Sequence, residues 1–363
     1  MKKVCHITTV HKGLDVRIYH KECITLSKDF EVYLIINDKI NQITNESVKL
    51  IEINNSSKNR LSRFFKAANE ALKKAIDINA DIYHLHDPEL LRIALKLKKR
   101  NKKVIYDAHE DLPRQILTKH WIPKIIRKPI AYFVEKAENN IVKKIDGVIT
   151  ATPTINERFD KLNSNSINVN NYPIIGEFKK TQKKITKPQI IYAGGISIER
   201  GIVEIIDSLE HLNVDLNLAG KFLDPSLKSK LESHKSWGKV NYKGFLGRKE
   251  ITELYNNSLV GMVTLYPTKN YQTSLPVKMF EYMAAGLPVI ASNFPYWESI
   301  IEKHECGICV DPTSVSDITK AIKTLVENPS IAKTMGENGL NAIKTHFNWE
   351  KEGQKLTSFY HQL

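Results

Sequence analysis

The sequence predicts an α/β protein made of two doubly wound domains, and three observations support this prediction. Short apolar runs alternate with helix-like segments, as expected for parallel sheets covered by helices. The alternation breaks once, near 172–188, where lysines and two prolines interrupt it, and then resumes. At 363 residues the chain is also long for one domain.

The first half contains five expected strands separated by helix-like segments. The strands are expected at 4–10, 31–36, 81–86, 103–109 and 147–151, and the helices near 18–29, 59–78, 88–99 and 125–142. We place the first domain at 1–175 and expect a last helix, 348–363, to pack back on it.

The second half repeats the pattern with six expected strands. They lie at 189–195, 214–220, 240–245, 259–265, 288–292 and 307–311. We place the second domain at 176–347. The chain contains no short tandem repeat or low-complexity tract, so this regularity belongs to a sheet architecture and not to a solenoid.

Composition restricts the protein class. No apolar run approaches the roughly 20 residues that cross a bilayer, and the N-terminus, MKKVCHITTV, has the pattern of a first strand, so we expect a cytoplasmic protein. Four cysteines are too few for a disulfide framework. Cys306 and Cys309 have metal or redox spacing, but they lead into a strand in which odd spacing turns the two sulfurs to opposite faces, so we favour a structural role.

The net charge of +14 is concentrated in residues 91–144, which hold 15 Lys or Arg and 5 Asp or Glu, or 15 − 5 = +10. Within this stretch, segment 114–129 mixes Trp121, Ile122, Ile125 and Ile126 with basic residues, which is typical of an element lying on an anionic membrane. Nucleic acid is a competing partner, ranked lower because no helix-turn-helix, RNP-type or zinc-finger signature is present. A merely solvated basic face is the third alternative.

Segment 271–291, YQTSLPVKMFEYMAAGLPVIA, predicts a turn, a short helix and a buried strand. Pro276 suits the first helical turn, so the N–H groups over 274–278 are expected to be open to an anion. Helical spacing from Ser274 places Lys278 and Glu281 on one face. Amide donors and a cation suit phosphates, and a carboxylate suits ribose hydroxyls, so the segment favours a sugar nucleotide. The alternative is an amphipathic helix with a solvated charge pair.

Segment 192–201, YAGGISIERG, predicts a strand, a turn at Gly194 and Gly195, and Arg200 at a helix start. Glycines let a phosphate approach the backbone, and Arg200 can neutralise it. The segment is neither a P-loop nor a GxGxxG fingerprint, and an ordinary strand-to-helix link remains the alternative.

Ligands of doubly wound sheets bind beyond the carboxyl ends of the strands, and unusual residues gather there in this sequence. They are His11, His84, His86 and His109 in the first half and Gly194, Gly195, Gly220 and Gly244 in the second. His109 stands beside Glu110 and can bind hydroxyls or polarise a leaving group; structural histidines are the alternative. His11, Asp15 and Arg17 suggest an acceptor contact, or Asp15 and Arg17 only cap and pair at a helix start.

In its ordered motifs the chain resembles the family 4 retaining glycosyltransferases of GT-B fold, most closely a subgroup of bacterial cell-surface polysaccharide enzymes. The motifs are TVHKGLDVRIYHKE, DIYHLHDPELL, VIYDAHEDLPRQI, YAGGISIERGI and SLPVKMFEYMAAGLPVIAS. The resemblance implies an N-terminal acceptor domain and a C-terminal nucleotide-sugar domain facing each other across a cleft. It also implies transfer without a metal and with retained anomeric configuration.

Matched residue by residue, the resemblance implies that Glu281, the second Glu of the family's E-x7-E pattern, holds the donor ribose. Arg200 stands where the family usually has a phosphate-binding Lys, and His109 matches the histidine near the transferred sugar. The chain departs from the family where Thr273 replaces the first Glu and Gly195 replaces a frequent Arg. Backbone groups over 273–275 are then expected to recognise sugar hydroxyls, with Lys278 supplying positive charge.

These arguments give a defined set of expected site residues. The catalytic residues are His109, Arg200, Lys278 and Glu281; the donor site comprises Gly194, Gly195, Arg200, Gly244, Phe245, Thr273, Ser274, Leu275, Pro276, Lys278 and Glu281; the acceptor site comprises His11, Asp15, Arg17, His86 and Glu110. No cofactor or metal is expected.

We expect a UDP- or GDP-linked sugar as donor, a saccharide acceptor that is lipid-linked, and contact with the inner membrane face through 91–144. The rival hypotheses are a GT-B protein that binds sugar nucleotides or glycans without turnover, a sugar-nucleotide epimerase on the same fold and, last, a nucleic-acid binder.

Overall fold

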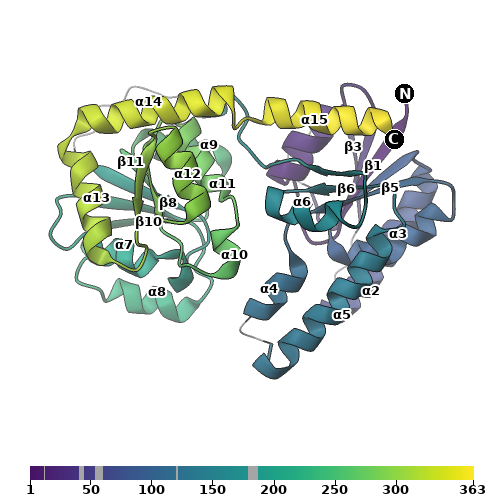
Figure 1. The fold of residues 1–363 in the computed structure, drawn as a ribbon, viewed down its shortest axis with the longest axis horizontal. Coiled ribbons are helices and arrows are strands. Elements are labelled where there is room, and N and C mark those ends of the chain that lie inside the picture. The colour runs from purple at the N-terminus through teal and green to yellow at the C-terminus, as the bar shows by residue number, and fades with distance from the viewer. Residues whose placement is uncertain (12, 41–44, 54–59, 120–121, 179–186) are drawn as a thin grey trace. The chain divides into compact units, whose positions relative to one another are not determined.

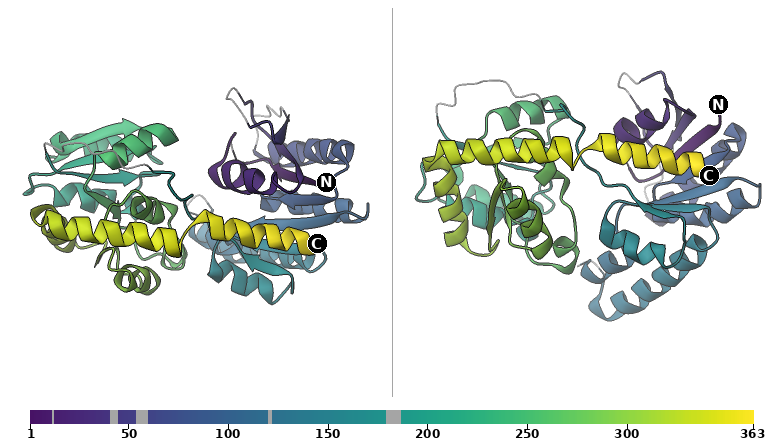
Figure 2. Two further views of the ribbon diagram at one scale, coloured as in Figure 1. Left: turned by 90° about the horizontal axis from the view of Figure 1, so that it is seen from above. Right: turned by 45° about the horizontal axis from the view of Figure 1, so that its top comes forward.

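A computed structural model describes the chain except residues 12, 41–44, 54–59, 120–121 and 179–186. It contains two compact units, residues 1–171 with 351–363, and residues 172–350. Each unit is a parallel sheet with helices packed against it (Figures 1 and 2). The predicted class of two doubly wound α/β domains is confirmed.

The first unit contains a seven-stranded parallel sheet with strand order β3-β2-β1-β4-β5-β6-β7. The strands are β1 (Lys3–Thr8), β2 (Glu31–Ile36), β3 (Val48–Glu52), β4 (Ile82–Leu85), β5 (Lys103–Ala108), β6 (Gly147–Thr150) and β7 (Ser166–Asn168). The sequence missed β3 and β7. Both are edge strands with incompletely buried side chains, so neither has a continuous apolar run.

Helices of the first unit connect these parallel strands. They are η1 (Val16–Cys23), α1 (Ile24–Leu26), α2 (Arg60–Ile78), η2 (Pro88–Leu90), α3 (Leu91–Lys98), α4 (Leu112–Thr118), α5 (Lys124–Val142), α6 (Pro153–Asp160) and α15 (Trp349–Gln362). Tyr360 of α15 packs into the sheet, where its hydroxyl lies 2.6 Å from His84 Nδ1. The last helix thus belongs to the core of the first unit.

The second unit contains a six-stranded parallel sheet with strand order β10-β9-β8-β11-β12-β13. The strands are β8 (Gln189–Ala193), β9 (Asp215–Ala219), β10 (Val240–Gly244), β11 (Val260–Val263), β12 (Val289–Ser292) and β13 (Gly307–Val310). All six were predicted. In both sheets the strand order reverses beside the first strand, at β1/β4 and at β8/β11, where ligands of such sheets bind.

Helices of the second unit complete the alternation. They are η3 (Ile198–Arg200), α7 (Ile202–Ser208), α8 (Pro225–Glu232), η4 (Trp237–Lys239), α9 (Arg248–Asn256), α10 (Lys269–Gln272), α11 (Val277–Ala284), α12 (Pro295–Lys303), α13 (Val315–Glu327) and α14 (Pro329–Thr345). Alternate residues of β8 enter two apolar layers, Ile191 and Ala193 on one face and Ile190 and Tyr192 on the other. Helices therefore bury both faces of this sheet.

The four cysteines are free thiols, and one detail of their prediction was wrong. Cys306 and Cys309 do not lie on opposite faces, because both pack against the same apolar cluster. Cys306 precedes β13 and so escapes the strand's alternation.

Candidate functional site

The turn after β8 brings two segments of backbone close together. Gly194 has φ +139°, and its N–H donates to the carbonyl of Ala219. A Cβ on Gly220 would lie 1.7 Å from the Gly194 carbonyl oxygen. Only glycine fits at this crossing of β8 and β9, and the turn leaves backbone accessible at the carboxyl edge of the sheet.

Two cationic side chains reach this turn from separate elements. A Cβ built on Gly194 would lie 3.1 Å from Lys278 Nζ of α11, and one on Gly195 would lie 3.7 Å from Arg200 Cζ of η3. Lys278 Nζ also lies 3.6 Å from the centre of the Tyr192 ring. The structure therefore brings Gly194, Gly195, Arg200 and Lys278 together, and we call these four residues the cation seat.

The cation seat carries buried donors without acceptors. Among the described residues, Lys278 Nζ and Arg200 Nε are buried and have no hydrogen-bond partner. Burial, and next the charge of Arg200, hold the pKa of Lys278 well below its usual value despite the opposing effect of Glu281. Burying a donor atom without an acceptor costs free energy, and for Lys278 it favours the neutral amine. A bound anion would remove that cost.

Glu281 lies in a separate polar arrangement. Its Oε1 lies 2.5 Å from Arg248 Nη1, and its Oε2 accepts a 2.9 Å hydrogen bond from the Tyr255 hydroxyl. Arg248 also pairs with Glu177 and stacks 4.9 Å above the centre of the Phe178 ring. The alternative of a solvated Lys278–Glu281 pair is therefore wrong.

Arg248 was missed by the sequence reasoning because its partners lie 33 and 71 residues away in the chain. The segment FLGRKE offers no local sign of this pairing.

Residues 273–276 differ in part from the expectation. The Ser274 N–H donates to the Tyr271 carbonyl at 3.1 Å, so this amide is not open to an anion. The helix begins at Val277, with Pro276 as its N-cap, so Ser274 lies outside the helical spacing assumed for it. Thr273 is exposed and its hydroxyl donates to the Lys269 carbonyl. Leu275 and Pro276 are half-buried.

Gly244, the last residue of β10, and Phe245, which follows it, lie at the same edge of the sheet. The Gly244 carbonyl accepts a 2.7 Å hydrogen bond from the N–H of Gly220, which packs on Gly194. Phe245 is 73% exposed, and Lys221 Nζ lies 5.0 Å from the centre of its ring. A flat apolar surface thus adjoins the cation seat through Gly220.

In the first unit, His109 is held by a buried carboxylate. Its Nε2 lies 2.9 Å from Asp107 Oδ2, and Arg17 Nη2 donates to Asp107 Oδ1 at 3.0 Å. Burial acts to raise the pKa of Asp107, but Arg17, then His109 and His86, outweigh it and hold the pKa well below its usual value. Asp107 is therefore ionised and fixes the imidazole. The sequence reasoning missed it, although it stands two residues before His109.

Two expected acceptor contacts, Arg17 and His86, were wrong, because the structure buries both. Arg17 is 3% exposed and donates to Asp107 and the Val169 carbonyl. It lies in η1 and not in a loop, since Asp15 caps that helix by accepting from two backbone N–H groups. His86 is 1% exposed, with its Nε2 2.9 Å from His6 Nδ1. Arg17 thus contacts Asp107, the partner of His109, and His86 contacts His109 itself.

His11, Asp15 and Glu110 remain accessible. His11 Nδ1 lies 3.6 Å from Asp15 Oδ2 and its Nε2 lies 3.6 Å from Asp87 Oδ1. The His11 and His109 ring centres are 4.8 Å apart. Glu110 is exposed and pairs with Gln115. Polar groups thus line this edge around His109.

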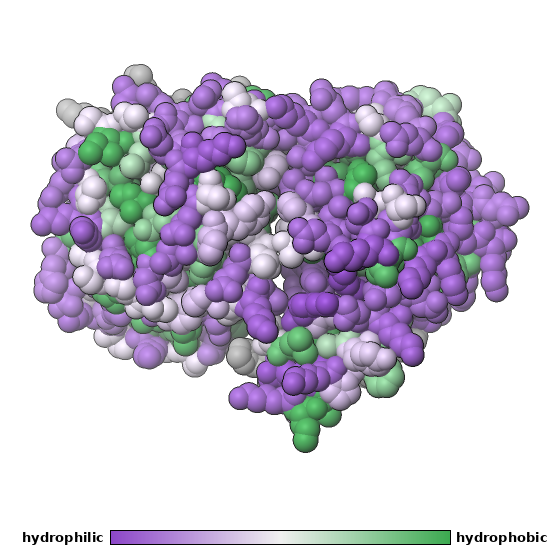
Figure 3. All heavy atoms as spheres, in the orientation of Figure 1, coloured by the Kyte–Doolittle hydropathy of each residue, from purple (hydrophilic) through white to green (hydrophobic). Residues whose placement is uncertain are grey.

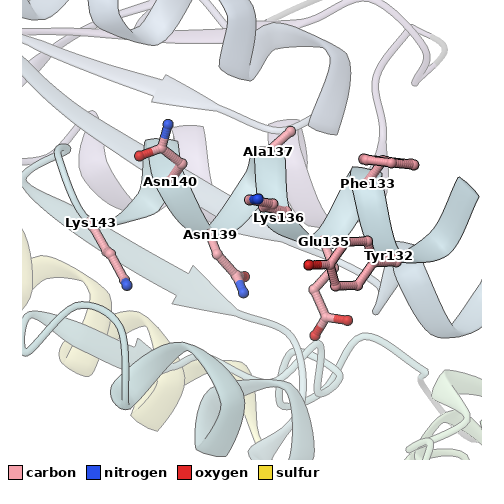
Figure 4. A pocket seen from close by; sticks show the side chains of 8 residues that line it. All are labelled: Tyr132, Phe133, Glu135, Lys136, Ala137, Asn139, Asn140 and Lys143. Carbon is pink, nitrogen blue, oxygen red and sulfur yellow. The ribbon is translucent and has the colours of Figure 1, made fainter. Parts of the chain in front are cut away.

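Helix α5 carries an exposed apolar stripe on its basic segment. The exposed residues are Ile125, Ile126, Tyr132 and Phe133, with Ile125 86% exposed. Apolar side chains are visible at the free end of the α4–α5 hairpin (Figure 3). An open cavity of about 730 Å³ runs along α5, lined by Tyr132, Phe133, Glu135, Lys136, Ala137, Asn139, Asn140 and Lys143 (Figure 4). Trp121 lies outside the described residues. Among the helices described, none has the length and apolar character of a membrane span.

Both halves of the chain match glycosyltransferase family models. Residues 7–169 match Glycosyltransferase Family 4, and residues 173–342 match Glycosyl transferases group 1. The uncharacterized glycosyltransferase MJ1069 of Methanocaldococcus jannaschii is 22% identical, over 75% of this chain and 71% of its own length. The alpha-D-kanosaminyltransferase of Streptomyces kanamyceticus is 21% identical, over 49% of this chain and 46% of its own.

Solved structures share the fold of both units. A sucrose-phosphate synthase from Thermosynechococcus elongatus has a TM-score of 0.80 at 16% identity, covering 100% of this chain and 99% of its own. HepE of Anabaena, solved with UDP-glucose, has a TM-score of 0.72 at 14% identity, with 100% of both chains covered. These similarities confirm the fold class that the sequence predicted.

Proposed function

We propose that this chain, a glycosyltransferase of GT-B fold, moves a sugar from a nucleoside-diphosphate sugar to a saccharide acceptor with retention of anomeric configuration. The observation that supports this most is the convergence of Arg200 and Lys278 on the turn at Gly194, where buried cationic donors lack acceptors among the described residues. A diphosphate supplies the missing acceptors. Retention follows from the resemblance to family 4.

The proposed reaction requires the protein to stabilise developing charge more than to form a covalent bond with the sugar. Breaking the anomeric bond places negative charge on the departing diphosphate, and Arg200 and Lys278 are positioned to stabilise it. Two side-chain cations at this place supply the charge that a metal supplies elsewhere, so we propose transfer without a metal. The acceptor hydroxyl attacks on the side from which the diphosphate leaves, and the phosphate accepts the proton.

Donor recognition is proposed around the cation seat. Glu281 accepts hydrogen bonds from the ribose hydroxyls, since each carboxylate oxygen has a second lone pair besides the one directed to Arg248 or Tyr255. Phe245 provides an exposed ring beside Gly244 for the base. HepE was solved with UDP and UDP-glucose, and a mannosyltransferase of Mycobacterium tuberculosis is GDP-mannose-dependent. UDP and GDP are therefore the first donors to test.

Acceptor recognition is proposed at His109, with His11 and Glu110 beside it. Relatives include a lipopolysaccharide core mannosyltransferase of Rhizobium leguminosarum, and WaaG, of similar fold, is involved in lipopolysaccharide biosynthesis. We therefore propose a saccharide acceptor, lipid-linked, in bacterial surface polysaccharide synthesis.

Ligand-induced shifts in melting temperature test donor binding. The full chain is heated with UDP, GDP, CMP or dTDP, with and without EDTA, and then incubated with the matching nucleotide sugars and a saccharide mixture. We expect one nucleoside diphosphate to raise the melting temperature equally with EDTA, followed by sugar transfer. Binding without transfer or hydrolysis would favour the non-catalytic alternative, and change of the sugar without acceptor would favour the epimerase.

We further propose that α5 rests on an anionic membrane surface. Its apolar stripe is flanked by Lys124 and Lys128, both exposed, which suits anionic head groups. Arg127 instead donates to the Ile122 carbonyl at 2.7 Å and is part of the hairpin. The two lysines are therefore the residues to test.

Liposome flotation tests this contact. Lys124→Glu with Lys128→Glu is compared with the matched pair Lys320→Glu and Lys344→Glu, two exposed lysines of α13 and α14. With anionic vesicles we expect wild type and the Lys320→Glu, Lys344→Glu double variant to float with the lipid. The Lys124→Glu, Lys128→Glu double variant should stay in the lipid-free fraction. Equal flotation of all three, or none by wild type, contradicts the proposal.

A further inference from the structure

Tyr192 of β8 contacts three parts of the cation seat from within the protein. Its side chain is fully buried, and its hydroxyl donates a 2.6 Å hydrogen bond to the Gly195 carbonyl. Lys278 Nζ lies 3.6 Å from the centre of its ring, and the guanidinium of Arg200 interacts with its hydroxyl oxygen. One side chain thus meets the backbone of the turn and both basic residues.

The Tyr192 hydroxyl can hold two of these neighbours at once. Burial raises the pKa of Tyr192 to about 12, although the charge of Arg200 acts to lower it. The hydroxyl is therefore protonated at neutral pH. Its hydrogen is directed to the Gly195 carbonyl, and its oxygen lone pairs remain to accept from the guanidinium of Arg200. One oxygen atom thus links the turn to the cationic side chain that reaches it.

The Tyr192 ring keeps the Lys278 amine near the same turn. The ring is itself fixed, since it belongs to the apolar cluster that includes Ile202 and Ile206 of α7. The Lys278 amine has no hydrogen-bond acceptor among the described residues, and the face of an aromatic ring is a weak substitute for one. The hydroxyl and the ring therefore have separate partners, and a substitution can remove the first and keep the second.

We propose that Tyr192 is a positioning residue, which holds Arg200 at the Gly195 turn in the arrangement that a diphosphate requires. This inference rests on the donor site proposed above and adds to it a residue that is too deeply buried to contact the ligand itself. When the hydroxyl is removed, binding of the diphosphate must also order the Arg200 side chain, and that ordering costs free energy. The loss should therefore affect the phosphates and leave recognition of the nucleoside unchanged.

The nucleotide affinities of wild type, Tyr192→Phe and Tyr83→Phe test the proposal, since phenylalanine keeps the ring beside Lys278 and removes only the hydroxyl. Tyr83 is the matched control, a buried tyrosine of the first unit whose hydroxyl donates to the Ala75 carbonyl, also at 2.6 Å. Dissociation constants for UDP and uridine, and for GDP and guanosine, are measured by ligand-observed NMR. Urea unfolding of both variants shows that they fold.

For Tyr192→Phe we expect the diphosphate that wild type prefers to bind about fivefold or more weakly, and its nucleoside to bind within about twofold of wild type. Tyr83→Phe should change neither affinity. Unchanged diphosphate affinity in Tyr192→Phe, or an equal loss for diphosphate and nucleoside, overturns the positioning role. If wild type binds neither UDP nor GDP, the proposed donor site fails as well. If wild type binds one of them and Tyr192→Phe binds it equally, only the role of Tyr192 fails.

A double-mutant cycle tests whether the hydroxyl acts through Arg200. Tyr192→Phe is added to wild type and to Arg200→Ala, and the affinity for the preferred diphosphate is measured in each. In the Arg200→Ala background we expect Tyr192→Phe to change the affinity by no more than about twofold, because the side chain that Tyr192 positions is gone. An equal loss in both backgrounds would contradict the proposal.

Discussion

In the first unit, the buried Arg17 lies within 3.1 Å of carboxylate oxygens of Asp107 and Glu22. In the second, the buried Lys278 amine has no acceptor among the described residues. Removing one partner of a buried ion pair leaves an uncompensated charge, whereas a buried amine without an acceptor costs free energy until a ligand arrives. The contrast indicates that the first arrangement holds residues in place and that the second awaits an anion.

Breaking the paired arrangement should have the largest effect. Arg17→Met leaves the ionised Asp107 buried beside the Glu22 carboxyl group without its cation, so we expect a loss of about 3–5 kcal/mol in unfolding free energy. Urea unfolding measures it, with Arg114→Met as control. Arg114 pairs at the surface, 47% exposed, and should cost about 1 kcal/mol or less. An equal loss of unfolding free energy in the two variants would show that the buried pairing of Arg17 matters no more to stability than a surface ion pair.

Acid should weaken the first unit through its buried histidines. Burial lowers the pKa of His86 to about 4, against about 6.5 in the unfolded chain. As the pH falls below 6.5 the unfolded chain gains the proton first, so the stability present above pH 6.5 is lost towards pH 4. For His86 this amounts to about 3 kcal/mol, and His6 and His84 act in the same direction.

Unfolding free energies at several pH values between 7 and 4 measure this slope. His86→Gln should flatten it, and His211→Ala, which changes an exposed residue, should not. A His86→Gln variant with the same pH slope as wild type would contradict neutral burial of His86.

Activity should depend on the second unit more moderately. We expect Arg200→Ala and Glu281→Ala each to raise the activation free energy of transfer by about 1.4 kcal/mol or more. This lowers the rate at least tenfold. Initial rates with the identified donor measure this, with the exposed Arg114→Ala as control. Wild-type rates in either variant would remove that residue from the donor site.

Sequence patterns predicted the sheets well because period and length carry that information locally. All six strands of the second unit are apolar runs, whereas β3 and β7 lack one. The residues of the cation seat were also predicted, since strand-end glycines and their neighbours are local features. The environment of Glu281 was not, because Arg248 reaches it from another helix.

The acceptor side was predicted less well for the same reason. Residue type identified His109 and Arg17 as candidates, but whether a side chain faces solvent depends on the helix that Asp15 caps. That helix turns Arg17 inward to Asp107, a pairing across 90 residues of sequence. Contacts over such separations leave no periodic trace.

Lys278→Met tests the central claim most directly, because it removes the buried amine that has no acceptor among the described residues and keeps a similar volume. Unfolding free energy without ligand and affinity for UDP and GDP are measured on wild type, Lys278→Met and Lys303→Met, the last an exposed control on α12. We predict that Lys278→Met is at least as stable as wild type but binds the preferred nucleoside diphosphate about tenfold or more weakly, a loss of about 1.4 kcal/mol. A less stable variant with unchanged nucleotide affinity would show that Lys278 serves the fold and not an anion.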